Sequence, residues 1–399
     1  MDDQLIERFA DLIVGFGANV QPGQVVAIGT EPGKERLARA IAASAYRHGA
    51  KFVDVSTFDI HVKRARLLYA EEESLDFVPS WFGERMLELG EQRCARVGLT
   101  GPVAPGLLDD LDPVRVGRDH LPFLKEAGEV VNARTTNWTA APCPTPEWAT
   151  LVHPGLEPAA AYALLCEQVA HLCRLDEDDP VAAWRSRMDR LTDVAGRLTA
   201  ARFDALHFEG PGTDLRIGLL PSSEWLTARF ETIEGLPHMP NIPSEETFTT
   251  PDPERVDGTV RSTKPLVLSG TIVRGLTIRF EGGRAVEMTA ESGAEALRAL
   301  TETDPGAARL GEVALVDAEG RVGALDTVFY DTLIDENAAS HIALGMAYGF
   351  AVSDDADRAR ANASTIHVDF MIGSPEVDVT GLAADGARVP ILRGGDWAI

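Results

Sequence analysis

Residues 335–348 read Asp-Glu-Asn-Ala-Ala-Ser-His-Ile-Ala-Leu-Gly-Met-Ala-Tyr and gather several chemically active side chains in one segment. Asp is a favourable first residue for a helix, because its carboxylate accepts otherwise unpaired backbone N–H groups. We therefore predict a helix that begins at Asp335, with Glu336 in its first turn. His341 and Tyr348 would lie two helical turns apart, on one face of this helix. A carboxylate, an imidazole and a phenol on one helix indicate a functional site rather than packing alone.

Two other segments carry carboxylates of the same kind. Residues 241–251, Asn-Ile-Pro-Ser-Glu-Glu-Thr-Phe-Thr-Thr-Pro, form a predicted loop or short extended piece in which Glu245 and Glu246 are adjacent. Prolines restrict the backbone at both ends of this loop. Residues 311–317, Gly-Glu-Val-Ala-Leu-Val-Asp, have the pattern of a buried strand with Glu312 at its mouth. An apolar strand of this kind favours burial of that carboxylate, which then needs a partner or a metal ion.

A fourth segment, residues 364–373, has the pattern of a strand in which His367 and Asp369 point to the same side. Mixed carboxylates and imidazoles suit zinc, cobalt or manganese. Four carboxylates favour two ions rather than one, because one catalytic zinc site usually needs only three protein ligands. If Glu246 is taken from its loop, the candidate ligands in the four segments are Glu246, Glu312, Glu336, His341, His367 and Asp369.

These four segments, in this order, resemble the aminopeptidase T family of dinuclear metallo-aminopeptidases (peptidase family M29). The resemblance covers essentially the whole chain. It implies that the six predicted ligands hold two divalent metal ions per chain and that Tyr348 is a site tyrosine. It also implies a homodimer with an enclosed active site, which would accept short peptides that have a free amino terminus.

The resemblance implies a metal-dependent aminopeptidase that removes N-terminal residues from peptides. The hypothesis for the mechanism is that a metal-activated bridging water in a dinuclear site attacks the peptide bond. Tyr348 would donate a hydrogen bond to the developing oxyanion. Glu245, beside the ligand Glu246, is the candidate general base; the alternative interpretation is that Glu245 faces solvent.

Two alternative functions stay open at this point. One is a diverged dinuclear metal amidase or dipeptidase that acts on a modified substrate. The other is a non-catalytic, metal-stabilised protein, which would have closed ligation with no open metal position. The residues do not determine the native metal, the preferred N-terminal residue or the carboxylate that bridges the two ions.

Composition limits the class of protein. The chain has 399 residues, 45% of them hydrophobic, which is enough for sizeable cores in two domains. Its net charge of −25 disfavours nucleic acid and anionic membrane surfaces as partners. There is no apolar run of roughly 18 residues that would span a membrane. The N-terminus lacks the basic region of a secretory signal and the four cysteines form no Cys-x-x-Cys pair, so we expect a cytoplasmic protein.

The order of the elements predicts an α/β fold. A strand at 25–29, a helix at 35–48 and a strand at 51–55 form a βαβ unit, which predicts a parallel sheet. We place a domain boundary near residue 200. Residues 1–200 would form an N-terminal α/β domain with a parallel sheet, and residues 201–399 a C-terminal α+β catalytic domain with a mixed sheet and the metal site.

Further elements and isolated histidines complete the predictions. Helical patterns cover 3–16, 158–173 and 180–201, and Gly282-Gly283 is typical of a hairpin turn. His238 precedes the Glu245-Glu246 loop and could reach the site. The remaining histidines without a surrounding motif are interpreted as structural, namely His48, His120, His153 and His171.

Overall fold

The structure is a computed structural model that describes residues 1–119, 121–122, 124–268 and 271–399. It divides into two compact units. Unit 1 contains residues 1–186 and 228–244, and unit 2 contains residues 187–227 and 245–399. The boundary near residue 200 remains a prediction, and the interpretation of His120 lies outside the described residues.

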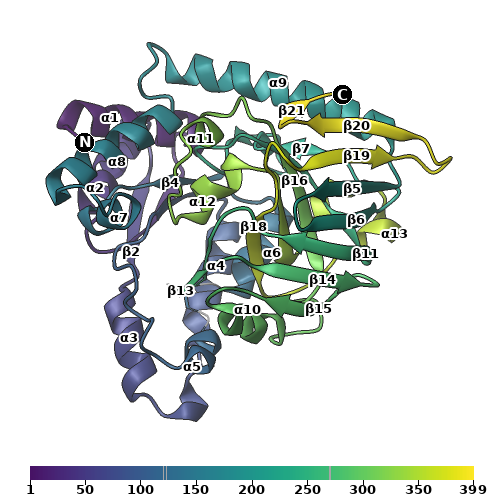
Figure 1. The fold of residues 1–399 in the computed structure, drawn as a ribbon. Helices are drawn as coiled ribbons and strands as arrows, with labels where there is room; N and C mark the ends of the chain where they lie inside the picture. Colours follow the sequence, from purple (N-terminus) through teal and green to yellow (C-terminus); the bar gives the residue numbers. More distant parts are fainter. Residues whose placement is uncertain (120, 123, 269–270) are drawn as a thin grey trace. The chain divides into compact units, whose positions relative to one another are not determined.

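A four-stranded parallel sheet, of which Figure 1 labels β2 and β4, forms the centre of unit 1. Its strand order is β2-β1-β3-β4. The strands are β1 (Val25–Thr30), β2 (Phe52–Thr57), β3 (Ala95–Thr100) and β4 (Trp138–Pro142). Helix α2 (Glu35–Arg47) joins β1 to β2 and buries one face, on which Leu37 and Ile41 recur at helical spacing. The predicted βαβ unit and parallel sheet are confirmed.

The other elements of unit 1 are mostly helices. Helix α1 (Asp3–Leu12) begins after Asp2, whose side chain accepts a hydrogen bond from the Leu5 backbone N–H. A π-helical turn (Ile13–Gly17) continues it. The remaining elements are α3 (Ile60–Tyr69), η2 (Glu72–Ser74), α4 (Ser80–Glu91), α5 (Pro113–Arg118), α6 (Lys125–Ala133), α7 (Pro146–Val152), α8 (Pro158–Leu172), β8 (Phe230–Glu231) and β9 (Pro237–His238).

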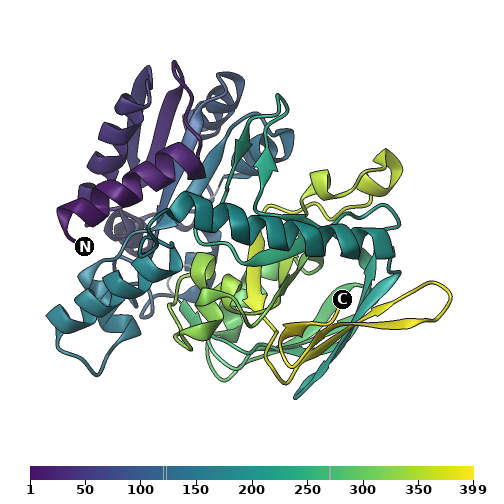
Figure 2. The same ribbon diagram turned by 90° about the horizontal axis from the view of Figure 1, so that it is seen from above.

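The long helix α9 (Pro180–Ala201) is seen from its side in Figure 2, and the division between the two units falls within it. The predicted helices at 158–173 and 180–201 are therefore confirmed. Among the residues that the structure describes, no helix combines the length and the apolar character that crossing a bilayer requires.

Unit 2 contains an eight-stranded antiparallel sheet with the order β15-β14-β11-β6-β5-β19-β20-β21. Its strands are β5 (Ala205–Gly210), β6 (Thr213–Leu219), β11 (Pro251–Arg261), β14 (Thr277–Glu281), β15 (Arg284–Thr289), β19 (Asp378–Leu382), β20 (Arg388–Arg393) and β21 (Asp396–Trp397). Gly282 and Gly283 join β14 to β15, both with positive φ, as a tight hairpin turn requires. The predicted hairpin is confirmed.

A second, five-stranded antiparallel sheet of unit 2 has the order β18-β17-β16-β10-β7. Its strands are β7 (Leu226–Thr227), β10 (Glu246–Thr249), β16 (Leu310–Val316), β17 (His341–Gly345) and β18 (His367–Met371). Smaller elements are β12 (Leu266–Leu268), β13 (Thr271–Val273), α10 (Ala294–Thr301), α11 (Arg321–Ala324), α12 (Thr332–Asp335), η3 (Glu336–Ala338), η4 (Gly349–Ala351) and α13 (Asp355–Arg358). Buried residues of both sheets share one hydrophobic core. The predicted α/β fold class, with a parallel sheet in one region and antiparallel sheets elsewhere, is confirmed.

The predicted helix over 335–348 is wrong. Asp335 ends the short helix α12, whose first turn is capped by Asp331, and His341 begins the strand β17. The apolar run pairs on both sides with neighbouring strands, so tertiary pairing overrides the helix preference of its alanines. Gly345 has φ +104°, which a right-handed helix cannot contain. His341 and Tyr348 therefore do not share a helix face.

Candidate metal centre

Five of the six predicted metal ligands lie on four neighbouring strands of the five-stranded sheet. They are Glu246 at the start of β10, Glu312 on β16, His341 at the start of β17, and His367 and Asp369 on β18. The sixth, Glu336, lies in the 3-10 turn η3 that precedes β17. One sheet therefore gathers side chains from segments that are far apart in the sequence.

The strand register places these side chains on one face of the sheet. Glu312 lies opposite Ala343, and Ala343 lies opposite Asp369 on the next strand. Opposed residues of antiparallel strands point to the same side, so these three residues form one row. His341 lies opposite Ala314, two residues along β16 from Glu312, and shares the same face.

Small residues separate the ligands on this face. Ala314, Ala343 and Gly345 occupy positions beside the ligands, and Gly345 lies opposite His367. The positions between them on the strands point the other way, into the hydrophobic core; they include Val313, Leu315, Ile342, Leu344 and Phe370. From Glu312 onwards along β16, the alternation of side chains therefore gives the sheet one apolar face and one ligand face.

The ligand atoms form two groups that share one carboxylate. Atoms of Glu246, Glu312 and His341 lie within 4.8 Å of one another, and so do atoms of Glu312, His367 and Asp369. In the first group, His341 Nε2 is 3.0 Å from Glu246 Oε2. In the second, His367 Nε2 is 3.3 Å from Glu312 Oε2 and 3.4 Å from Asp369 Oδ1. Glu312 is the member common to both groups.

Both histidines present the same nitrogen to the carboxylates. The Nδ1 atom of His367 lies 2.8 Å from the Met346 carbonyl oxygen, and Nδ1 of His341 lies 3.3 Å from the Ala339 carbonyl oxygen. A carbonyl oxygen only accepts hydrogen bonds, so each Nδ1 carries a proton. In the neutral imidazole, Nε2 then directs a lone pair at carboxylate oxygens. This arrangement is repulsive unless a cation lies between the two groups or Nε2 also takes up a proton, and carbonyl-anchored histidines are common at metal sites.

The charge balance of the cluster also favours bound cations. Burial, together with Asp369 and Glu246, raises the pKa of Glu336 well above its ordinary value. Burial alone would lower the pKa of His341, but the hydrogen bond to Glu246 and the nearby carboxylates raise it to about 10. The cluster thus takes up protons to offset its excess of negative charge, and divalent cations would supply that charge directly. The residues present fit metal ions that prefer carboxylate and imidazole ligands.

Comparison with known proteins identifies the family. A family model described as thermophilic metalloprotease (M29) matches residues 2–397. The chain belongs to this family. It is 44% identical over 403 residues to aminopeptidase T of Thermus thermophilus, covering 99% of this chain and 98% of the relative. It is 38% identical over 403 residues to aminopeptidase 2 of Geobacillus stearothermophilus, covering 98% of this chain and 97% of the relative.

A solved structure, wild-type AmpT from Thermus thermophilus, has the same fold. It superposes with a TM-score of 0.89 at 42% sequence identity and covers 99% of both chains. The predicted family and the predicted hydrolase class are confirmed, and this M29 chain is a metallopeptidase.

Tyr348 reaches the ligand face of this M29 protein from the loop that follows β17. Its ring centroid is 5.3 Å from that of His367, 5.6 Å from that of Phe248 and 5.4 Å from that of Phe350. Burial raises the pKa of the Tyr348 phenol, so the hydroxyl keeps its proton and remains a donor. The structure therefore brings Tyr348 to the site next to His367, although not by the predicted helix.

Glu245 has different neighbours from those of Glu246. It is 0% exposed and pairs with Arg187, which also pairs with Asp317. The alternative interpretation, that Glu245 faces solvent, is wrong. Sequence reasoning did not single out Arg187, which lies in a helix without a site motif, 58 residues from Glu245 in sequence. No local pattern links residues at such separations.

Asn337, also missed, ties two ligand segments together. Its Oδ1 accepts a hydrogen bond of 2.6 Å from the Glu245 backbone N–H, and its Nδ2 donates one of 2.8 Å to the Leu333 carbonyl oxygen. Its position next to Glu336 in a predicted ligand segment was the signal that could have found it.

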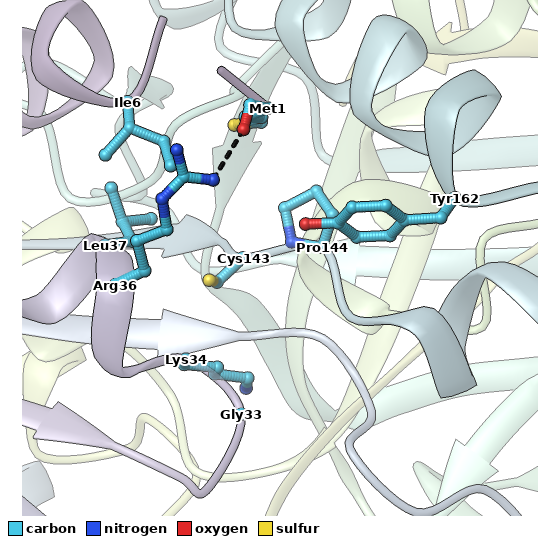
Figure 3. A pocket seen from close by; sticks show the side chains of 9 residues that line it. All are labelled: Met1, Ile6, Gly33, Lys34, Arg36, Leu37, Cys143, Pro144 and Tyr162. Carbon is cyan, nitrogen blue, oxygen red and sulfur yellow. Dashed lines mark hydrogen bonds between the residues drawn. The ribbon is translucent and has the colours of Figure 1, made fainter. Parts of the chain in front are cut away.

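Two further features belong to unit 1. His238 is buried and packs against the rings of Trp138 and Phe230. Figure 3 shows a pocket bordered by residues of α1, α2 and α8, with Tyr162 on one side. Lys34 in this pocket already contacts Glu31 Oε2 at 2.6 Å and the Leu99 carbonyl oxygen at 3.1 Å. None of the predicted metal ligands lines this pocket.

Proposed function

We propose that this protein is a metal-dependent aminopeptidase that hydrolyses N-terminal residues from short peptides. The observation that carries the proposal is Glu312, which belongs to two groups of carboxylate and imidazole ligands on one face of one sheet. Its relatives in Thermus and Geobacillus are named aminopeptidases, which supports a substrate with a free amino terminus.

In this proposal the chain holds two divalent ions. Glu246, Glu312 and His341 would hold one ion, Glu312, His367 and Asp369 would hold the other, and Glu336 lies close enough to interact electrostatically with both groups. Zinc, cobalt and manganese all accept this ligand set. When bound, such ions activate water near neutral pH and polarise the scissile carbonyl group. Glu312 is common to both groups, so its carboxylate would help to hold both ions.

Protein side chains would orient the reaction. Tyr348 would donate a hydrogen bond to the oxyanion that develops at the scissile carbonyl oxygen, a kind of contact that is typically worth about 3 kcal/mol. The carbonyl groups of Ala339 and Met346 would hold the two imidazoles with Nε2 directed at the ions. Glu245 remains the predicted general base, although a base at this position would first have to release its contact with Arg187.

The test is release of amino acids from unblocked and N-acetylated leucyl peptides. The protein is first treated with a chelator, and zinc, cobalt or manganese is then restored. We expect release from the free-amine peptide alone, and only after a metal is restored. Release from the acetylated peptide would indicate an amidase or another peptidase specificity. Two bound ions without hydrolysis of either peptide would contradict the enzymatic proposal.

A homodimer and a cytoplasmic location belong to the same proposal. Gel filtration coupled to light scattering tests the first, because a strict monomer would remove the support for an enclosed, dimer-dependent active site.

A further inference from the structure

A buried arginine of unit 2 joins the ends of the strands that carry Glu246 and Glu312. Arg187 lies on α9 and is 9% exposed. Its Nε donates to Glu245 Oε2, and its Nη2 donates to Asp317 Oδ1 at 2.6 Å. Glu245 and Asp317 are 0% and 1% exposed, so all three charged side chains are buried.

This ion triad is better suited to fixing geometry than to adding stability. The cost of removing buried charges from water offsets most of their attraction, so apolar groups of similar size often stabilise a fold as well. A guanidinium, however, is a rigid planar fork that holds carboxylates in one orientation. Burial lowers the pKa of Arg187, but the two carboxylates more than offset this effect and keep the side chain charged.

The triad acts on the strand ends at the metal centre. Glu246 lies opposite Val316 in the register of β10 and β16. Glu245 is the residue just before β10, and Asp317 is the residue just after β16. Arg187 therefore clamps the two strand ends one residue beyond the pair that contains Glu246.

The third ligand segment is attached to the same clamp. Asn337 accepts a hydrogen bond from the backbone N–H of Glu245 and is the neighbour of Glu336 in η3. Arg187 Nη2 also lies 3.4 Å from the backbone carbonyl oxygen of Glu245. Glu245 is thus held through both its side chain and its backbone. These contacts connect the segment of Glu246 to the segment of Glu336.

We propose that Arg187 is a positioning residue for the metal centre. Through Glu245 and Asp317 it sets the separation of β10 and β16, and so the separation of the Glu246 and Glu312 carboxylates that would hold the first ion. The inference rests on the proposed function, because it needs the cluster to bind divalent ions. It assigns Glu245 a structural task that the general-base prediction does not include.

The experiment compares Arg187→Met with Arg190→Met in the full-length protein. Arg190 lies one turn further along α9 and pairs with Glu319 at the surface, where both side chains are about half exposed. The affinity for cobalt(II) is measured by chelator competition, and the visible absorption spectrum reports ligand geometry, both well below the melting temperature. We expect Arg187→Met to weaken cobalt binding by roughly 10- to 100-fold and to alter the spectrum. Arg190→Met should match the wild type, and Arg187→Lys should restore only part of the affinity.

Each outcome separates the inference from the proposed function. A wild type that binds no divalent ion would remove both. If a folded Arg187→Met variant binds cobalt as tightly as the wild type does, only the positioning role of Arg187 is contradicted. If Arg187→Met does not fold, the variant that combines Arg187→Met, Glu245→Gln and Asp317→Asn leaves no buried charge unpaired and takes its place. Wild-type cobalt affinity in that variant would overturn the inference.

The Glu245→Gln variant distinguishes the two tasks suggested for Glu245. Loss of a general base lowers kcat while cobalt affinity and the cobalt spectrum stay unchanged. Loss of a positioning contact weakens cobalt binding as well, and this is the result that we expect.

Discussion

The two halves of the candidate metal centre differ in burial. In one half the side chains of His341 and Glu246 are 1% and 8% exposed, whereas in the other those of His367 and Asp369 are 19% and 13% exposed. Glu312 belongs to both halves and is itself buried. An ion in the buried half should exchange slowly, and an ion in the open half should be the one that substrate reaches.

The position of Tyr348 agrees with substrate access at the more exposed half. Its ring packs against His367, in the open half, and its hydroxyl keeps its proton because burial raises its pKa. The hydrogen-bonded clamp of Arg187 and Asn337 lies instead on the segments of Glu246 and Glu336. Under the proposed function, one half would hold its ion rigidly and the other would meet the peptide.

The largest effect should follow from removing the carboxylate that the two halves share. Glu312→Gln takes a charged ligand from both groups, so we expect the loss of both ions and a fall in kcat/KM of at least about 10³-fold, equivalent to several kcal/mol. Metal content and peptide hydrolysis measure the effect. The control is Glu295→Gln, which alters a carboxylate that is 72% exposed on α10. Retention of one full ion by Glu312→Gln would show that the halves do not depend on a common ligand.

The next largest effect should be confined to the open half. Tyr348→Phe keeps the ring contacts with Phe248 and His367 but removes the hydroxyl donor. We expect kcat to fall by roughly 10²- to 10³-fold, the usual loss for one oxyanion donor, with unchanged metal content. Steady-state kinetics on a leucyl peptide gives the result. A loss of metal, or a change in KM alone, would contradict the donor role.

The sequence predicts those parts of the structure that depend on residues close together in the chain. The parallel sheet of unit 1 follows from short patterns, since β1, α2 and β2 are adjacent in sequence and each has a clear periodicity. The strand predicted over 364–373 contains β18 (His367–Met371), and with it the shared face of His367 and Asp369. These features depend on local spacing.

The failures arise from partners that are distant in sequence. The segment that contains His341 has helix-forming alanines, but pairing with β16 and β18 makes it a strand. A short apolar run does not distinguish the two structures by periodicity. The contact between Arg187 and Asp317 spans 130 residues and carries no sequence motif. The candidate ligands could be recognised from the sequence, whereas the residues that position them, such as Arg187 and Asn337, could not.

A smaller effect should appear in the pH dependence of the metal-free protein. Burial acts to lower the pKa of His341, but the hydrogen bond to Glu246 and the nearby carboxylates outweigh it and raise the pKa from its ordinary 6.5 to about 10. A raised pKa stabilises the fold fully below pH 6.5, and this contribution is lost as the pH rises through about 10. We therefore expect the free energy of unfolding in chelator to fall between pH 7 and pH 9, by at most about 1.4 kcal/mol per pH unit for each proton.

Metal should reverse this trend, because a ligand imidazole is neutral and binding displaces its proton. Urea unfolding at several pH values, with chelator and with zinc, measures both curves. The stabilisation by zinc should grow with pH. A metal-free protein that becomes more stable between pH 7 and pH 9 would show that the imidazoles do not carry the compensating charge.

The smallest effect tests the comparison of the two halves most directly, through the stability of two matched variants. His341→Ala leaves the buried Glu246 carboxylate without its imidazole partner, so the metal-free protein should lose about 1–3 kcal/mol of unfolding free energy. His367→Ala removes a more exposed imidazole, and we expect a loss of less than about 1 kcal/mol because water can reach the partly exposed Asp369 carboxylate that remains. Each variant should keep one ion. Equal losses in urea unfolding would mean that the difference in exposure has no energetic counterpart, and that rigid and reactive roles are not divided between the halves.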